Sequence, residues 1–211
     1  MYPNKVIAII PARSGSKSIK NKNIIKLGDK PLLGWAVQSC FETKLISKVF
    51  VSTDSIKYAN IAKQYGPVEI ILRPKKISSD KSTDYEMIKH AIENITFEYN
   101  YIAHIRPTTP LRRKNDLNIA IKNFVNSKFT SLRSVHEMSE TSYKTLELRK
   151  GVLKSLKNLN YTLDELNGPR QNFKKTYTPN GVIDIYKKNL IIKNKQLFGN
   201  RVKAYETAYT H

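Results

Sequence analysis

The stretch Val6-Ile7-Ala8-Ile9-Ile10-Pro11-Ala12-Arg13-Ser14-Gly15-Ser16-Lys17 joins a continuous apolar run to a small, basic loop. An apolar run without alternation is typical of a strand that is buried on both faces, as in a parallel sheet. Ligands of such sheets bind beyond the carboxyl ends of the strands. The opening residues therefore predict a central parallel strand that delivers a polar loop to a binding site.

Further along the chain, strand-like and helix-like segments alternate. We expect strands at 6–10, 48–52, 68–72 and 100–105, and helices at 32–41, 55–65, 82–95 and 114–127. This alternation is typical of an α/β fold with right-handed crossovers. The sequence thus predicts a Rossmann-like, mostly parallel sheet flanked by helices, with polar loops at 11–23, 52–54, 73–84 and 106–112.

After residue 130 the rhythm changes. Strands are expected at 130–136, 145–148 and 181–186 with no long helix between them, and 150–180 is rich in loop residues. We therefore predict one domain over 1–211 with a small inserted β-arm at about 137–180. Arms of this kind often make dimers, so a homodimer is expected.

The composition limits the classes of partner that the protein is expected to bind. The 211 residues carry a net charge of +20, yet the lysines are scattered, which does not favour nucleic acid as the main partner. A basic chain suits a polyanionic small substrate. The single cysteine, Cys40, allows neither a disulfide framework nor a zinc site and is expected to be a buried thiol. No apolar run approaches ~18 residues, so we expect a cytoplasmic protein with no membrane partner.

The loop at 11–23 has the chemistry of a phosphate site. It carries a glycine, serines and four cationic side chains, which can supply backbone N–H donors and mobile positive charge to phosphate oxygens. It is neither a Walker A loop nor a Gly-x-Gly-x-x-Gly loop. An ordinary solvated basic loop is the alternative that composition alone leaves open.

Several blocks of residues occur in an order that resembles one family. They are Pro11-Ala12-Arg13, Gly15-Ser16-Lys17, Lys22-Asn23, Ser52-Thr53-Asp54, Arg73-Pro74, Ser79-Asp80-Lys81-Ser82-Thr83, Arg106 to Arg112, Lys144-Thr145, Pro169-Arg170-Gln171 and Pro179-Asn180-Gly181. The ordered set resembles the CMP-sialic acid synthetases (acylneuraminate cytidylyltransferases). That resemblance implies a cytidylyltransferase in which the anomeric hydroxyl of a nine-carbon acidic sugar attacks the α-phosphorus of CTP and pyrophosphate leaves.

The resemblance also implies roles for particular residues. Arg13, Lys17 and Lys22 would contact the triphosphate. Arg13 and Lys22 would be catalytic, with Lys22 as the chief stabiliser of charge at the transferring phosphate. The nucleotide would be bound by Ala12, Arg13, Ser16, Lys17, Lys22, Asn23, Arg73, Asp80, Ser82 and Thr83. Asp80 could instead be a turn or N-cap carboxylate.

The acidic sugar needs cations for its carboxylate, and a guanidinium can bind two oxygens at once. Arg106, Lys144 and Arg170 are the candidates, so the insertion at about 137–180 is expected to take part in sugar binding as well as in dimerisation. Asp184 is expected to face the cleft from the strand at 181–186. Sialic acid synthetases usually have Gln where this chain has Arg106, so a legionaminic-type sugar fits the sequence better.

Magnesium is the expected cofactor, but its protein ligands are not identifiable. Relatives continue into an Ile-Asp-x-Asp-like segment, whereas this sequence ends at Tyr205-Glu206-Thr207-Ala208-Tyr209-Thr210-His211. Three alternatives stay open: a truncated homologue that binds CTP without turnover, a synthetase for the eight-carbon acid KDO, and a nucleic-acid binder.

Overall fold

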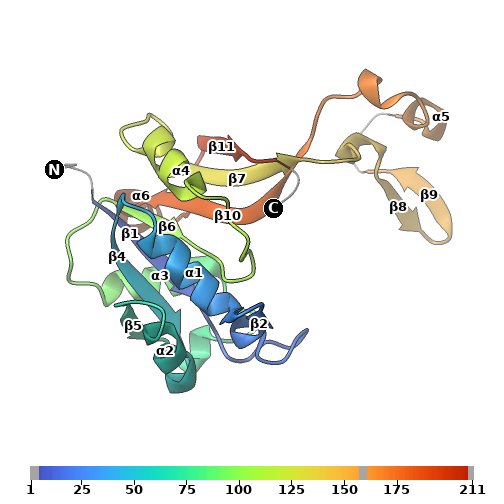
Figure 1. Ribbon diagram of the computed structural model, residues 1–211. Coiled ribbons are helices and arrows are strands. Elements are labelled where there is room, and N and C mark those ends of the chain that lie inside the picture. Colours follow the sequence, from blue (N-terminus) through green and yellow to red (C-terminus); the bar gives the residue numbers. More distant parts are fainter. Residues whose placement is uncertain (1–4, 157–160, 209–211) are drawn as a thin grey trace.

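The computed structural model describes residues 5–156 and 161–208 (Figure 1). Residues 157–160 of the expected insertion, and 209–211 of the terminal segment, lie outside the described residues. The core is a seven-stranded sheet in the order β11-β7-β10-β6-β1-β4-β5. Its strands are β1 (Val6–Pro11), β4 (Ile46–Thr53), β5 (Glu69–Leu72), β6 (Tyr101–His104), β7 (Ser131–Glu137), β10 (Tyr177–Lys187) and β11 (Val202–Glu206).

Only β10 runs against its neighbours in the described sheet. It pairs antiparallel with β6 and β7, while the other neighbouring strands pair in parallel. The prediction of a mostly parallel, Rossmann-like sheet is confirmed. Because the parallel strands end at one edge, the loops that follow β1, β4, β5 and β6 gather there.

Helices cover both faces of the sheet. Val6, Ala8 and Ile10 of β1 pack on one side with α1 (Leu32–Phe41), α2 (Ile56–Lys63) and α4 (Asp116–Phe124). Ile7 and Ile9 pack on the other side with α3 (Asp84–Glu93) and α6 (Lys188–Asn194). Successive side chains of a strand point to opposite faces, so the unbroken apolar run of β1 fills both halves of the core.

The expected helices are all present, each beginning and ending within a few residues of its predicted bounds. The sequence missed a small hairpin of β2 (Lys26–Leu27) and β3 (Lys30–Pro31), as well as α6 and β11. The stretch 150–180, expected to be rich in loop residues, also contains short elements that were not predicted individually. That stretch contains β9 (Val152–Ser155), α5 (Leu163–Leu166) and the start of β10, and β9 pairs with β8 (Leu146–Arg149) in a separate two-stranded sheet.

The expected β-arm is confirmed. Figure 1 shows the β8–β9 hairpin and α5 projecting well away from the seven-stranded sheet, on segments that continue β7 and β10. At the base of β10 the register shifts between Pro179 and Asp184, and Gly181 has φ +73°. A residue with a side chain adopts that backbone conformation only at a cost, which accounts for glycine here.

Candidate functional site at the carboxyl edge of the sheet

A cavity of about 180 Å³ opens at the carboxyl edge of the sheet. Loops from β1, β5 and β6 and the start of α3 form its walls. They contribute Pro11, Arg13, Lys22, Asn23, Arg73, Ser79, Ser82, Thr83, Asp84, Met87, Arg106, Pro107 and Thr108. Six of the ten residues expected to bind nucleotide therefore line one cavity, together with Arg106.

The loop at 11–23, called the phosphate loop below, is held at its base by the end of β4. The Ala12 amide donates to the Ser52 carbonyl over 2.9 Å, and the Thr53 hydroxyl donates to the Ala12 carbonyl over 2.6 Å. Ala12 is fully buried, so it shapes the floor of the loop with its backbone. Because these bonds come from the neighbouring parallel strand, the loop leaves the sheet in a fixed direction.

Asp54 was not among the predicted site residues, yet its hydrogen bonds to Ser14 hold the loop at 11–23 in place. Its carboxylate accepts from the Ser14 amide over 2.7 Å and from the Ser14 hydroxyl over 3.0 Å. On the other side, the Asn23 amide group donates to the Arg13 carbonyl over 3.0 Å. The position of Asp54 at a strand end, in Ser52-Thr53-Asp54, is the signal that could have found it.

The three cations expected at the triphosphate differ in their partners. Arg13 pairs with Asp80 over 2.6 Å and Lys17 pairs with the same carboxylate over 2.9 Å. Lys22, which lines the cavity, has no ion pair among residues 5–156 and 161–208. Hydrogen bonds from Lys17 and Arg13 hold the pKa of Asp80 below its usual value. The ion pairs join the phosphate loop to the segment before α3.

Thr83, rather than Asp80, begins α3. Its hydroxyl accepts from the Glu86 amide over 3.2 Å, and the Glu86 carboxylate accepts from the Thr83 amide over 2.7 Å, which forms a capping box. The Ser82 hydroxyl accepts from the Ser79 amide over 3.0 Å. These local bonds fix the wall of the cavity opposite the phosphate loop. Ser16 and Lys17 lie on the loop but are not among the side chains that line the cavity.

Arg73 is buried at the floor of the cavity. Its guanidinium donates to the Ser52 carbonyl over 3.1 Å, and its amide donates to the Thr53 carbonyl over 2.7 Å. Burial lowers the pKa of Arg73, and the positive charge of Arg13 lowers it further, although Asp54 opposes that effect. Two cations that line the same cavity favour an anion between them.

Arg106 stands between two carboxylates. One of its amino groups donates to Asp184 over 2.6 Å and the other to Asp84 over 2.7 Å. Asp184 is 1% exposed, and Arg133 also approaches it over 3.4 Å. The predicted cleft-facing position of Asp184 is therefore wrong, because its carboxylate is buried behind Arg106 and does not line the cavity. Asp84 and Arg133 were missed because each meets its partner only through the sheet topology.

His104 and Tyr186 extend this buried polar cluster. The His104 ring nitrogen Nδ1 lies 3.1 Å from the Tyr186 hydroxyl, which donates to Asp184 over 3.4 Å. Burial lowers the pKa of His104 to about 3, and the positive charge of Arg106 adds to that effect. His104 is therefore a core histidine, and it is neutral at pH 7.

Lys144 and Arg170 lie in the arm rather than at the cavity. Lys144 donates to the Gly168 carbonyl over 2.9 Å. Arg170 donates to Glu137 over 2.9 Å and to the Met138 carbonyl over 3.0 Å. Both side chains brace the arm within this chain, and the structure does not bring them to the cavity of the same chain.

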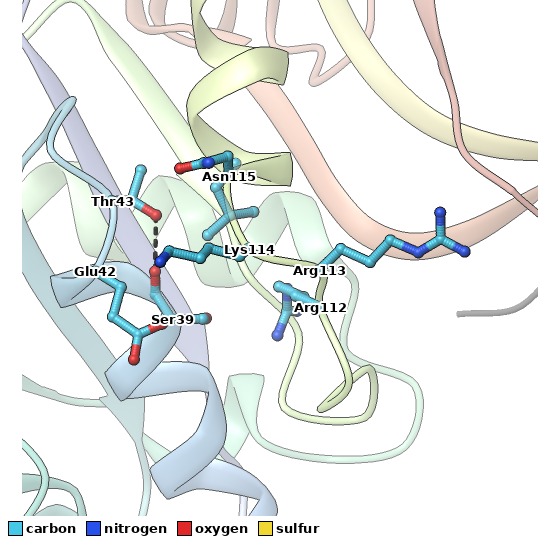
Figure 2. A pocket seen from close by; sticks show the side chains of 8 residues that line it. Ser39, Glu42, Thr43, Arg112, Arg113, Lys114 and Asn115 are labelled. Carbon is cyan, nitrogen blue, oxygen red and sulfur yellow. Dashed lines mark hydrogen bonds between the residues drawn. The ribbon is translucent and has the colours of Figure 1, made fainter.

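A second and larger cavity, of about 560 Å³, lies between the end of α1 and the start of α4 (Figure 2). None of the residues expected to bind nucleotide or sugar lines it. Figure 2 shows Lys114 reaching toward Ser39 and Thr43 while Arg113 extends in the opposite direction. Cations that diverge in this way do not form a cradle for a phosphate.

Two features are absent from the described part of the chain. No group of three or more His, Cys, Asp or Glu side chains is gathered to hold a metal ion. No described helix has the length and apolar character needed to cross a membrane. Cys40 is buried as expected, and burial raises the pKa of its thiol to about 12.

The mostly parallel sheet and the cationic cavity at its carboxyl edge define an α/β fold of the nucleotidyltransferase type. The sequence pattern of the cytidylyltransferase family matches residues 7–208, so the chain belongs to that family.

The relatives and neighbours agree with this assignment. An N-acylneuraminate cytidylyltransferase of Escherichia coli O18:K1:H7 (strain RS218 / NMEC) is 36% identical over 202 residues, which cover 95% of this chain and 46% of that protein. A Helicobacter pylori protein, named pseudaminic acid cytidylyltransferase and UDP-2,4-diacetamido-2,4,6-trideoxy-beta-L-altropyranose hydrolase, is 30% identical over 204 residues, covering 96% and 38%. The chain thus spans less than half the length of these relatives.

Among solved structures, a CMP:2-keto-3-deoxy-manno-octonic acid synthetase complexed with CTP has a TM-score of 0.70 to this chain. The similarity covers 97% of this chain and 90% of that one, at 15% sequence identity. At that identity the likeness shows the fold alone.

Proposed function

We propose that this chain transfers CMP from CTP to a nonulosonic acid and releases pyrophosphate. The observation that carries the proposal is the cavity that holds Arg13, Lys22 and Arg73 at the carboxyl edge of the sheet. Membership of the cytidylyltransferase family and the printed names of the relatives support cytidine and an acidic nine-carbon sugar as the substrate classes.

The proposed chemistry asks the protein mainly for position and charge. The sugar's anomeric oxygen forms a bond to the α-phosphorus while the bond to the leaving pyrophosphate breaks. Negative charge grows on the phosphate oxygens, and preorganised cations at such a point lower the barrier. Lys22 is the strongest candidate for this role, because it lines the cavity and has no ion pair in the described chain.

Nucleotide specificity is proposed to come from the floor and the far wall of the cavity. The Arg73 guanidinium donates to the Ser52 carbonyl and its backbone amide donates to the Thr53 carbonyl. Asn23 lines the same cavity, and Ala12 is buried at the base of the loop. Ser82 and Thr83 are fixed by the turn before α3 and its capping box. Groups fixed in this way bind a base and ribose without losing much side-chain freedom.

Of the three cations expected to bind the sugar carboxylate, Arg106 lines the cavity whereas Lys144 and Arg170 do not, and its two carboxylate partners hold it in place. Arg106 in place of the usual Gln favours a legionaminic-type acid. In this proposal Asp184 does not contact the sugar but orients the Arg106 guanidinium through their hydrogen bond.

Magnesium is part of this proposal, carried by the triphosphate oxygens. Among the described residues no three His, Cys, Asp or Glu side chains are gathered to hold a metal ion, and Asp84, which lines the cavity, is bonded to Arg106. In many phosphate sites magnesium is bound mainly by water and phosphate oxygens, so few protein ligands are needed.

We include a cytoplasmic location in the proposal, as expected from the sequence.

We also propose that the chain forms a homodimer through its arm. The β8–β9 hairpin exposes Leu148 at 72%, Val152 at 55% and Leu153 at 50%, on a segment that projects from the body (Figure 1). Exposed apolar side chains gathered on one element are typical of a covered surface. In such a dimer, the arm of one protomer would supply Lys144 and Arg170 to the cavity of the other, on the side where Arg106 lies.

The decisive assay measures pyrophosphate release from CTP and Mg²⁺ with a panel of nonulosonic acids and KDO. Replacing Lys22 by Ala should lower kcat by about 100-fold or more, the usual loss for one charge-stabilising donor. Lys20→Ala changes an exposed lysine of the same loop and is the matched control. CTP binding without release from any sugar would favour the non-catalytic alternative.

The dimer is tested by sedimentation of a Leu148→Asp variant. We expect it to be monomeric at concentrations where the parent chain is dimeric. Ile56→Asp alters an apolar side chain of similar exposure, 60%, on α2 and should leave the dimer intact. A Leu148→Asp variant that stays dimeric would place the interface elsewhere.

A further inference from the structure

Asp80 places a negative charge where the phosphate loop presents its cations. One carboxylate oxygen is 2.6 Å from Arg13 and the other is 2.9 Å from Lys17. The Asp80 side chain is 30% exposed, so the two cations hold the carboxylate at the surface of the protein and not in its core. With one oxygen on each cation, the group imitates two oxygens of a phosphate.

The same two cations are those expected to hold the triphosphate. Arg13 lines the cavity next to Lys22 and Arg73, and Arg13 lowers the pKa of Arg73 by charge repulsion. Without a nucleotide, Asp80 relieves part of that repulsion. Lys22 is left without an ion pair among the described residues, and it remains available to an incoming phosphate.

From these contacts we propose that Asp80 is an internal competitor of the phosphate groups, which returns to Arg13 and Lys17 when pyrophosphate leaves. The inference rests on the proposed function, because it concerns the same cavity. It makes Asp80 a positioning residue that favours product release. No bond is made or broken in this exchange of ion pairs.

Electrostatics gives the expected sign whichever way Asp80 moves. If the carboxylate is displaced by a phosphate, two ion pairs are lost. If it stays, a negative charge lies beside the bound phosphates. Both cases weaken phosphate binding, so a neutral side chain at position 80 should strengthen it. Each exposed ion pair changes an equilibrium by a factor of about 1.4 to 5, and the two together by roughly two- to thirtyfold.

The test is titration calorimetry of inorganic pyrophosphate into the parent chain and into Asp80→Asn, without sugar. We expect pyrophosphate to bind Asp80→Asn more tightly, by at least about twofold. Asp80→Glu keeps the charge and should restore weaker binding. Asp29→Asn is the control for net charge, since Asp29 is 71% exposed and pairs with Lys30 away from the cavity.

Equal or weaker binding by Asp80→Asn, in a variant with the parent's thermal unfolding midpoint, would overturn the inference. If Asp80→Asn does not fold, Asp80→Ala is titrated instead, with the same criterion. The result is independent of turnover. Tighter pyrophosphate binding by a chain that releases none from CTP would sustain this inference and refute the proposed function. Pyrophosphate release from CTP by the parent chain, together with no tighter pyrophosphate binding by Asp80→Asn, would support the proposed function and refute this inference.

Discussion

Replacing Asp184 by Asn should destabilise the fold far more than replacing Asp84 by Asn, although both carboxylates bind the same guanidinium. Asp184 is 1% exposed and lies 2.6 Å from Arg106 and 3.4 Å from Arg133. Asp84 is 49% exposed and lies 2.7 Å from Arg106. The two ion pairs thus share one cation and have nearly equal length, but they differ in burial.

The magnitudes follow from that difference. Removing one partner of a buried ion pair costs about 3–5 kcal/mol, because a buried charge is left uncompensated. In Asp184→Asn, Arg106 keeps Asp84 as a partner, which places the loss near the lower end, about 3 kcal/mol. An exposed pair contributes about 0.2–1 kcal/mol, so Asp84→Asn should cost less than about 1 kcal/mol.

Urea unfolding of the parent and the two variants measures both losses. Equal m-values are needed, since a change in m signals a change in the surface exposed on unfolding. A loss for Asp84→Asn as large as that for Asp184→Asn would contradict this expectation, and so would a loss for Asp184→Asn below about 1 kcal/mol. Either result would mean that burial does not set the strength of this cluster.

Two further predictions concern His104 and Gly181. The native pKa of His104 is lowered to about 3 by burial, whereas the unfolded chain takes up a proton below about 6.5, so stability should fall by about 1.4 kcal/mol per pH unit between pH 6.5 and 3. Urea unfolding from pH 7 to 4 should show this slope, and a His104→Gln variant should flatten it; an unchanged slope would assign it to other groups. Gly181→Ala puts a Cβ 2.9 Å from the Thr109 hydroxyl in a left-handed conformation, which itself costs about 1–2 kcal/mol. Gly28→Ala has a similar φ with open space around it, and thermal melts should show the smaller loss there; equal losses would exclude the Thr109 contact as a cause.

The sequence was sufficient for the central strands because burial on both faces leaves a continuous apolar run, as in Val6 to Ile10. It was sufficient for most of the cavity because loops at the carboxyl ends of parallel strands meet at one edge. Apolar spacing placed the helix expected at 82–95, although the capping box that starts it at Thr83 was found only in the structure.

The missed features depend on partners distant in the chain. The strand at 152–155 is mostly exposed and stable only against 146–149, so it has no apolar signature of its own. Asp184 meets Arg133 because their strands pair at that register. Asp84 meets Arg106 because a helix start and a strand end share one edge of the sheet. Such contacts follow from topology, which a pattern of residue types specifies only in outline.

The most direct test of the central claim is a crystal structure of this chain with CTP. We predict that the phosphates lie within hydrogen-bonding distance of Arg13 and Lys22, in the cavity floored by Arg73, with Asp80 separated from Arg13. CTP bound elsewhere, for instance in the cavity between α1 and α4 (Figure 2), with Lys22 turned into solvent, would contradict it.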